Sequence, residues 1–105
     1  MEKSILFICE SGISASLFVS KMLESVKVHQ LDYEIDYAPI ARVAEKLSYR
    51  DYDVILLAPQ VKRHEAEVKD ILLKKKCVSH ITGIQDDEFV SMNVERILER
   101  INQLG

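Results

Sequence analysis

The feature that most constrains the fold is the alternation of short apolar segments with longer segments whose apolar residues recur at helical spacing. Ser4 to Cys9 (SILFIC) and Asp53 to Ala58 (DVILLA) are nearly continuous apolar runs, which are typical of strands buried on both faces of a parallel sheet. Residues 33–38 (YEIDYA) and 77–82 (CVSHIT) roughly alternate between apolar and polar side chains, which indicates two further strands nearer the edges. The pattern therefore predicts four strands.

Each predicted strand is followed by a segment with the apolar periodicity of an amphipathic helix. The expected core positions are Leu17, Val19, Met22, Leu23 and Val26; then Ile40, Val43, Ala44 and Leu47; then Val61, Val68, Ile71 and Leu72; and finally Val90, Val94, Ile97, Leu98 and Ile101, preceded by Asp86 and Asp87 as expected helix caps. Repeated strand–helix units with right-handed crossovers predict an α/β fold. We expect a single domain over residues 1–105, with a four-stranded parallel sheet of order 2-1-3-4 and helices on both faces.

Composition and charge narrow the classes of function. A chain of 105 residues with 48% hydrophobic residues has the size of one domain and can bury a core without disulfides or metal ions. Its formal net charge of −3 provides no basic surface for nucleic acid, so we expect no nucleic-acid partner. The sequence contains no apolar run of membrane-spanning length and no signal peptide at its N-terminus, which predicts a cytoplasmic protein.

The cysteines and histidines do not form a metal-binding pattern. In a reducing cytosol Cys9 and Cys77 are expected to be thiols rather than a disulfide. The histidines at positions 29, 64 and 80 lack the spacing of metal ligands, both among themselves and relative to the cysteines. We therefore expect neither a metal nor a cofactor, and we interpret Cys77 as a small buried apolar residue.

Cys9 differs because it ends the first predicted strand, where a parallel sheet commonly binds ligands. The turn from this strand into the next helix directs backbone N–H groups and a helix N-terminus toward the sulfur, which favours both a thiolate and a bound phosphate. We therefore predict a nucleophilic Cys9 with a lowered pKa, followed by a phosphate-binding segment. Its residues are Glu10, Ser11, Gly12, Ile13, Ser14, Ala15 and Ser16.

Known phosphate loops of other classes fit this segment poorly. It lacks both the Walker pattern and the Gly-x-Gly-x-x-Gly pattern, which disfavours a nucleotide site. The low-molecular-weight tyrosine phosphatases use a Cys-x5-Arg loop, but the arginine position is occupied here by Ala15. Those enzymes also use an aspartate followed by proline as a general acid, whereas Pro39 and Pro59 each follow alanine. Hydrolysis of a phosphate ester is therefore poorly supported.

Two segments resemble one known family. Cys9 to Leu17 (CESGISASL) is similar to the active-site segment of the IIB components of the bacterial sugar phosphotransferase system, in the lactose/cellobiose (chitobiose) family. Residues 54–60 (VILLAPQ) resemble the apolar strand of that family, which ends in Gly-Pro-Gln. The resemblance covers essentially the whole chain and implies an architecture like that of low-molecular-weight tyrosine phosphatases and flavodoxin-like proteins. This sequence differs from the family pattern at Ala15, where the family commonly has threonine, and at Glu10, which places a carboxylate beside the phosphate site.

The resemblance implies a phosphocysteine carrier that acts as a protein-phosphohistidine–sugar phosphotransferase. Cys9 would accept a phosphoryl group from a IIA protein and pass it to a sugar, such as cellobiose, chitobiose or lactose, held by a membrane IIC component. The predicted strand order places Pro59 and Gln60 beside the loop, as candidate contacts for the phosphate or for a partner. Two alternatives remain open at this point: a cysteine phosphatase or arsenate-reductase-like enzyme, and a regulatory binding module built on a reactive thiol.

Overall fold

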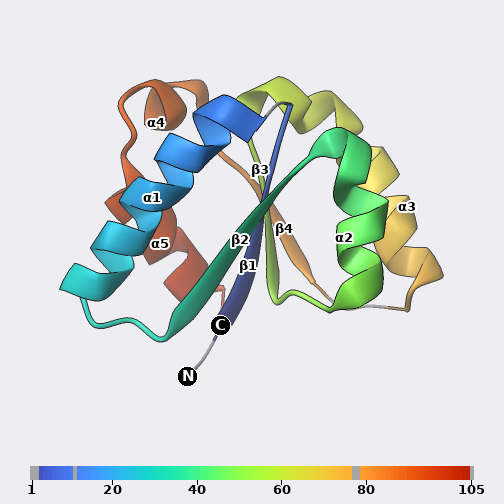
Figure 1. The fold of residues 1–105 in the computed structure, drawn as a ribbon, viewed down its shortest axis with the longest axis horizontal. Coiled ribbons are helices and arrows are strands. Elements are labelled where there is room, and N and C mark those ends of the chain that lie inside the picture. Colours follow the sequence, from blue (N-terminus) through green and yellow to red (C-terminus); the bar gives the residue numbers. More distant parts are fainter. Residues whose placement is uncertain (1–2, 11, 77–78, 105) are drawn as a thin grey trace.

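Four parallel strands form one sheet in the order β2-β1-β3-β4 (Figure 1). The computed structural model of the chain describes residues 3–10, 12–76 and 79–104. The strands are β1 (Lys3–Cys9), β2 (Tyr33–Pro39), β3 (Val54–Leu57) and β4 (His80–Gly83). The predicted fold class and strand order are therefore confirmed, with β4 beginning later than expected. Cys77, at the predicted start of that strand, lies outside the described residues.

Burial along the strands follows their position in the sheet. The central strands β1 and β3 are almost wholly buried, as their continuous apolar sequences require, because helices cover both faces of the sheet. Ile5 is paired with Ile35 on one side and with Val54 on the other, so apolar side chains continue across three strands. The edge strands are less buried, in agreement with their mixed sequences.

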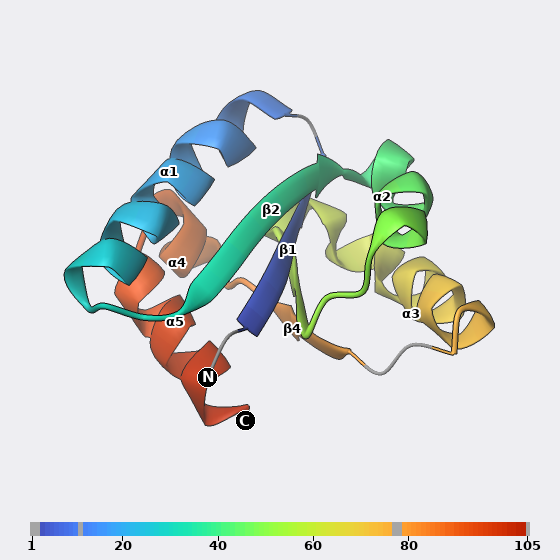
Figure 2. The same ribbon diagram turned by 60° about the horizontal axis from the view of Figure 1, so that its bottom comes forward.

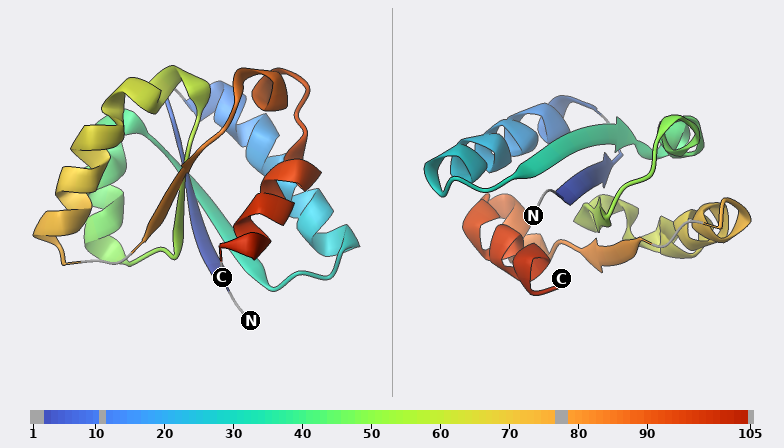
Figure 3. Two further views of the ribbon diagram at one scale, coloured as in Figure 1. Left: turned by 180° about the vertical axis from the view of Figure 1, so that it is seen from behind. Right: turned by 90° about the horizontal axis from the view of Figure 1, so that it is seen from below.

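The helices lie in two layers. One face of the sheet is covered by α1 (Gly12–Val28), α4 (Asp86–Val90) and α5 (Val94–Gln103), and the other by α2 (Val43–Tyr49) and α3 (Glu65–Lys74) (Figures 1 and 3). Short 3-10 helices η1 (Ile40–Arg42) and η2 (Pro59–His64) precede α2 and α3. The two chain ends lie at the same end of the sheet (Figure 2), where Lys3 Nζ donates a hydrogen bond to the carbonyl oxygen of Ile101 at 2.9 Å.

The buried face of α1 is rotated relative to the prediction. Val19, Met22 and Val26 are buried as expected, but Leu17 and Leu23 are exposed, and their assignment to the core is wrong. Phe18 is fully buried instead. Its ring centroid lies 5.1 Å from that of Phe7 in β1 and 5.2 Å from that of Phe89 in α4. A large aromatic ring that contacts two other elements gains more from burial than either leucine.

The apolar positions predicted for the second and third helical segments also include residues outside the core. Val43 and Leu47 of α2 are buried, whereas Ala44 is exposed and Ile40 is only partly buried. In the third stripe Ile71 is only partly buried, while Val61, Val68 and Leu72 belong to the core. These helices each bury a narrower stripe than the sequence predicts.

The last predicted helix is in fact two helices. The helix is interrupted at Met92, whose φ of 53° lies in the left-handed region. Val90 therefore falls outside the core stripe and is 83% exposed. Asp86 and Asp87 are not the caps: Gln85 caps α4 in a reciprocal capping box with Glu88, and the Asn93 side chain accepts a hydrogen bond from the Arg96 amide to cap α5.

Candidate active site

The site is centred on Cys9, the last residue of β1 at the carboxyl-terminal edge of the sheet. Cys9 lies opposite Pro39 of β2, and the neighbouring Ile8 is paired with Leu57 of β3. The Ala58 amide then donates to the Ile8 carbonyl oxygen at 3.0 Å, which holds the start of η2 against the end of β1. Because β1 is central, its carboxyl end is flanked by the connections that leave β2 and β3 (Figure 1).

The Cys9 thiol is almost completely enclosed. Its residue is 4% exposed, and Sγ donates to the carbonyl oxygen of Ala38 at 3.7 Å. Burial raises the pKa of the Cys9 thiol, because the charged thiolate is poorly solvated there. The residue's own backbone N–H acts in the opposite direction, with a smaller effect. The predicted lowering of this pKa is therefore wrong for the unmodified protein.

The segment after Cys9 enters α1 almost at once. Ser11 lies outside the described residues, and for Gly12 to Ala15 the structure gives the helical backbone alone. Glu10 and Ser16 are both exposed. Helix α1 thus starts three positions after the cysteine, and the N–H groups of its first turn have no partner within the helix. The phosphate-binding role of residues 10–16 stays a prediction.

The predicted contact residues Pro59 and Gln60 begin η2 beside this loop. Pro59 is partly buried at the first helical position, and the side chain of Gln60 is exposed. The Gln60 carbonyl oxygen accepts a hydrogen bond from Arg63 Nη1 at 3.0 Å. Arg63 Nη2 in turn lies 3.8 Å from Glu10 Oε1, next to Cys9. Arg63 is not among the residues that the sequence predicts for the site, although it belongs to a basic run over residues 62–64, shortly after Gln60.

A hollow of about 280 Å³ lies on the β2 side of the site. Its lining includes Tyr37 and Pro39 at the end of β2, together with Arg42 and Tyr49 from the helical segments that follow. Pro39 connects the hollow to the site, because it is the register partner of Cys9. The hollow therefore adjoins the end of β2 that lies opposite Cys9.

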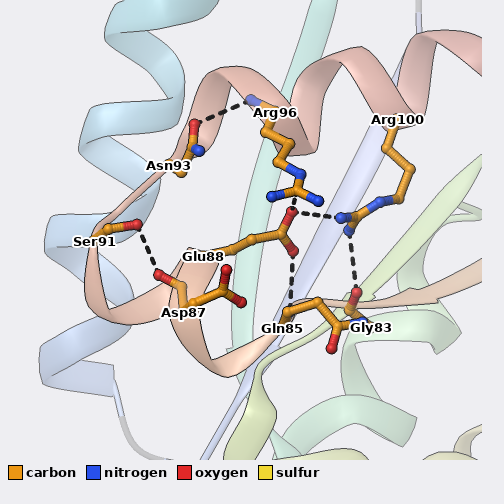
Figure 4. Close-up of polar contacts among 8 residues, drawn as sticks. All are labelled: Gly83, Gln85, Asp87, Glu88, Ser91, Asn93, Arg96 and Arg100. Carbon is orange, nitrogen blue, oxygen red and sulfur yellow. Dashed lines mark hydrogen bonds and ion pairs between the residues drawn. The ribbon is translucent and has the colours of Figure 1, made fainter.

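A buried ionic cluster supports the same edge of the sheet from α4 and α5 (Figure 4). Glu88 is 1% exposed, and its carboxylate lies 2.5 Å from Arg100 and 3.3 Å from Arg96. It also accepts the Gln85 amide at 3.0 Å, while Arg100 donates to the Gly83 carbonyl oxygen at the end of β4. All of these groups are matched, so the cluster is structural: it joins α4 to α5 and to the sheet.

Neither a metal-binding cluster nor a membrane-spanning helix is found among the described residues. Within residues 3–10, 12–76 and 79–104, no three His, Cys, Asp or Glu side chains lie close enough to hold a metal ion together. No helix in the same part of the chain is both long enough and apolar enough to cross a membrane.

Comparison with known proteins gives one consistent result. Residues 4–100 match the family described as "PTS system, Lactose/Cellobiose specific IIB subunit". Two solved structures are similar over 94% of this chain. The lactose-specific IIB domain from Streptococcus pneumoniae has a TM-score of 0.74, 17% sequence identity and 97% of its own length covered. The cellobiose-specific IIB protein from Borrelia burgdorferi has a TM-score of 0.71, 26% identity and 87% covered.

Proposed function

This chain belongs to the lactose/cellobiose-specific IIB family of the sugar phosphotransferase system, and from that membership we propose that Cys9 carries the phosphoryl group. The donor is the phosphohistidine of a IIA protein. The acceptor is a sugar bound by a membrane IIC component, a β-linked disaccharide such as cellobiose, chitobiose or lactose. The protein works in the cytoplasm and docks on IIC at the inner face of the membrane.

The observation that carries this proposal is the position of Cys9. It ends a central strand three residues before the first residue of α1, where backbone N–H groups are available to a phosphoryl group. These neutral backbone donors stabilise the bound anion. The same segment has no arginine at position 15, and neither proline follows an aspartate, so attack by water is not promoted.

The raised pKa of Cys9 fits the proton balance of the first step. Sγ bonds to phosphorus as the nitrogen–phosphorus bond of the donor breaks, and the thiol proton passes to the departing imidazole nitrogen. In the second step a sugar hydroxyl bonds to phosphorus and the sulfur–phosphorus bond breaks. The hydroxyl proton then returns to Sγ, so that the buried thiol is neutral again.

Mass spectrometry after incubation with phosphoenolpyruvate, the general phosphotransferase proteins and a IIA protein tests the proposal. We expect one phosphoryl adduct, on Cys9. In a Cys9→Ser protein the adduct should be absent while the fold is retained, because a hydroxyl without an adjacent base is a far weaker nucleophile. Cys77→Ser is the matched control and should accept phosphate normally.

The same measurement separates the alternatives. Rapid release of inorganic phosphate by the protein alone would support a phosphatase. Oxidation of Cys9 without any phosphoryl adduct would support a thiol-based regulatory module. An adduct that persists in Cys9→Ser would move the phosphorylation site elsewhere, with His64 the next residue to test.

A further inference from the structure

An exposed ion pair lies directly beside the proposed phosphorylation site. Glu10 follows Cys9 in the chain, and its Oε1 is 3.8 Å from Nη2 of Arg63. We propose that Arg63 is a phosphoryl-binding residue, which Glu10 holds beside Cys9 until the phosphoryl group arrives. The inference rests on the proposed function, which supplies the phosphoryl group on Cys9.

The geometry favours Arg63 over its basic neighbours. The stem of Lys62 passes over Gly83, with Cε 3.1 Å from where a Cβ on that glycine would lie, so Lys62 is directed toward β4. His64 Nδ1 lies 2.9 Å from Glu67 of α3. Arg63 faces Glu10 instead, while its Nη1 donates to the Gln60 carbonyl oxygen. One guanidinium is thus anchored on η2 and points to the residue next to the thiol.

The charges explain why such a pair is useful here. A phosphoryl group brings a charge of about −1.5 to −2 at neutral pH, close to the carboxylate of Glu10. Without a counter-ion the two anions would repel each other. Arg63 relieves this repulsion, because a guanidinium can bind phosphoryl oxygens through two parallel hydrogen bonds, which a point charge cannot provide.

The weakness of the resting ion pair permits the exchange. Both side chains are largely exposed, and an exposed pair at this distance contributes at most about 1 kcal/mol. Separating Arg63 from Glu10 therefore costs little free energy, whereas a phosphoryl dianion attracts the guanidinium more strongly than a single carboxylate does. η2 itself stays in place, because Val61 is fully buried and the start of η2 is hydrogen-bonded to β1.

Three variants test the inference with inorganic phosphate as the first probe. Arg63→Gln removes the guanidinium, Glu10→Gln removes its resting partner, and Lys69→Gln removes one surface charge from the Lys69–Glu65 pair of α3 as a matched control. Titrations followed by amide NMR shifts around Cys9 should show about fivefold weaker phosphate binding in Arg63→Gln. Glu10→Gln should bind phosphate more tightly, and Lys69→Gln should match the parent within about twofold.

The phosphorylated protein provides the second probe. Phosphorus NMR gives the pKa of the phosphoryl group on Cys9, which a neighbouring cation lowers. Relative to the parent protein, Arg63→Gln should raise this pKa and Glu10→Gln should lower it, while Lys69→Gln leaves it unchanged. Arg63→Lys should fall between the parent and Arg63→Gln, because it keeps the charge but loses the paired donors. Unchanged amide spectra away from the loop verify that each variant folds.

The outcomes distinguish this inference from the function on which it rests. If Cys9 is phosphorylated but Arg63→Gln and Lys69→Gln have the same phosphate affinity and the same phosphoryl pKa, Arg63 does not bind the phosphoryl group. If no variant and no parent protein acquires phosphate on Cys9, the proposed function fails, and the inference fails with it.

Discussion

Two opposing influences act on the Cys9 thiol at the scale of the single residue. The start of α1 and the residue's own backbone N–H favour a thiolate, whereas enclosure at the end of a central strand disfavours it. Enclosure is the stronger influence in the unmodified protein, so the pKa is raised. The raised pKa keeps the thiol protonated at neutral pH, which limits its side reactions.

This balance predicts slow alkylation of Cys9 in the folded protein. In a Cys77→Ser background, iodoacetamide should modify Cys9 at pH 7.5 at least about tenfold more slowly than in the urea-unfolded chain, where the thiol pKa is near 8.5. The folded rate should keep rising with pH well above that value, because the native thiol ionises later. A folded rate that levels off below pH 8 would contradict the raised pKa, and mass spectrometry of the adduct measures it.

At the same scale, the sequence predicted that Cys9 ends the first strand, but it did not predict what surrounds the thiol. Cys9 is identifiable because an apolar run ends there before a Gly- and Ser-rich turn. Its enclosure depends on the position of β2, where the Ala38 carbonyl oxygen accepts a hydrogen bond from the thiol. That contact is determined by tertiary packing. The pairing of Glu10 with Arg63 likewise depends on how the start of η2 lies against β1.

At the scale of the elements, helix ends were harder to predict than strands. The strands β1 and β3 are built on continuous apolar runs, so their positions follow from the sequence pattern. The break between α4 and α5 has neither glycine nor proline: Met92 adopts the left-handed conformation that glycine usually provides. A helix can also bury either Leu17 or Phe18, and only the neighbouring Phe7 and Phe89 rings decide between them.

The end of α1 provides a direct test of left-handed strain. Gln30 has a φ of 55°, and the amides of Gln30 and Leu31 close the helix onto the carbonyl oxygens of Lys27 and Val26. Since Gln30 is exposed, Gln30→Gly should raise the free energy of unfolding by about 1 kcal/mol. The control Glu99→Gly, at an exposed position inside α5, should lower it by about 0.5–1 kcal/mol. Urea denaturation measures both; equal effects would rule out strain at Gln30.

The ionic cluster of α4 and α5 gives a second prediction at this scale. Glu88→Ala leaves the guanidinium of Arg100 without its buried partner and removes half of the α4 capping box. We expect it to lower the free energy of unfolding by about 3–5 kcal/mol. Glu99→Ala, an exposed site on the same α5 helix, should change it by less than about 0.5 kcal/mol. Similar urea midpoints for the two variants would show that the cluster contributes little.

At the scale of the whole molecule, the carboxyl-terminal edge of the sheet and the opposite edge have different roles. The first carries Cys9, η2 and the Glu88 cluster, while the opposite edge joins the chain ends through the bond from Lys3 to Ile101. The strand order was predictable because β1 and β3 are the most apolar strands and must lie in the centre. Cys9 and the start of η2 are thus anchored on the buried central strands of the sheet.

The buried phenol of Tyr52 gives a prediction for the whole molecule at alkaline pH. Tyr52 is 3% exposed and its hydroxyl donates to Asp36 Oδ2 at 2.6 Å; burial, followed by this hydrogen bond, raises its pKa well above the usual value. The pKa of Tyr33 and of Cys9 is raised as well. In each case the unfolded chain loses its proton first, so the stabilising contribution is complete below the unfolded pKa and is lost as pH rises toward the folded one.

We therefore expect the free energy of unfolding to fall between about pH 8.5, where the unfolded thiol ionises, and pH 11, where unfolded tyrosines are ionised. Tyr52→Phe should lower stability at pH 7.5 by about 1–3 kcal/mol, through the lost hydrogen bond to a carboxylate, and should also make the alkaline decline shallower. Tyr49→Phe is the matched control, because Tyr49 is 78% exposed, and it should leave both quantities unchanged. Urea midpoints measured at half-unit pH intervals provide the comparison. A decline of the same slope in the parent and in Tyr52→Phe would show that the Tyr52 phenol does not govern the alkaline limit of this fold.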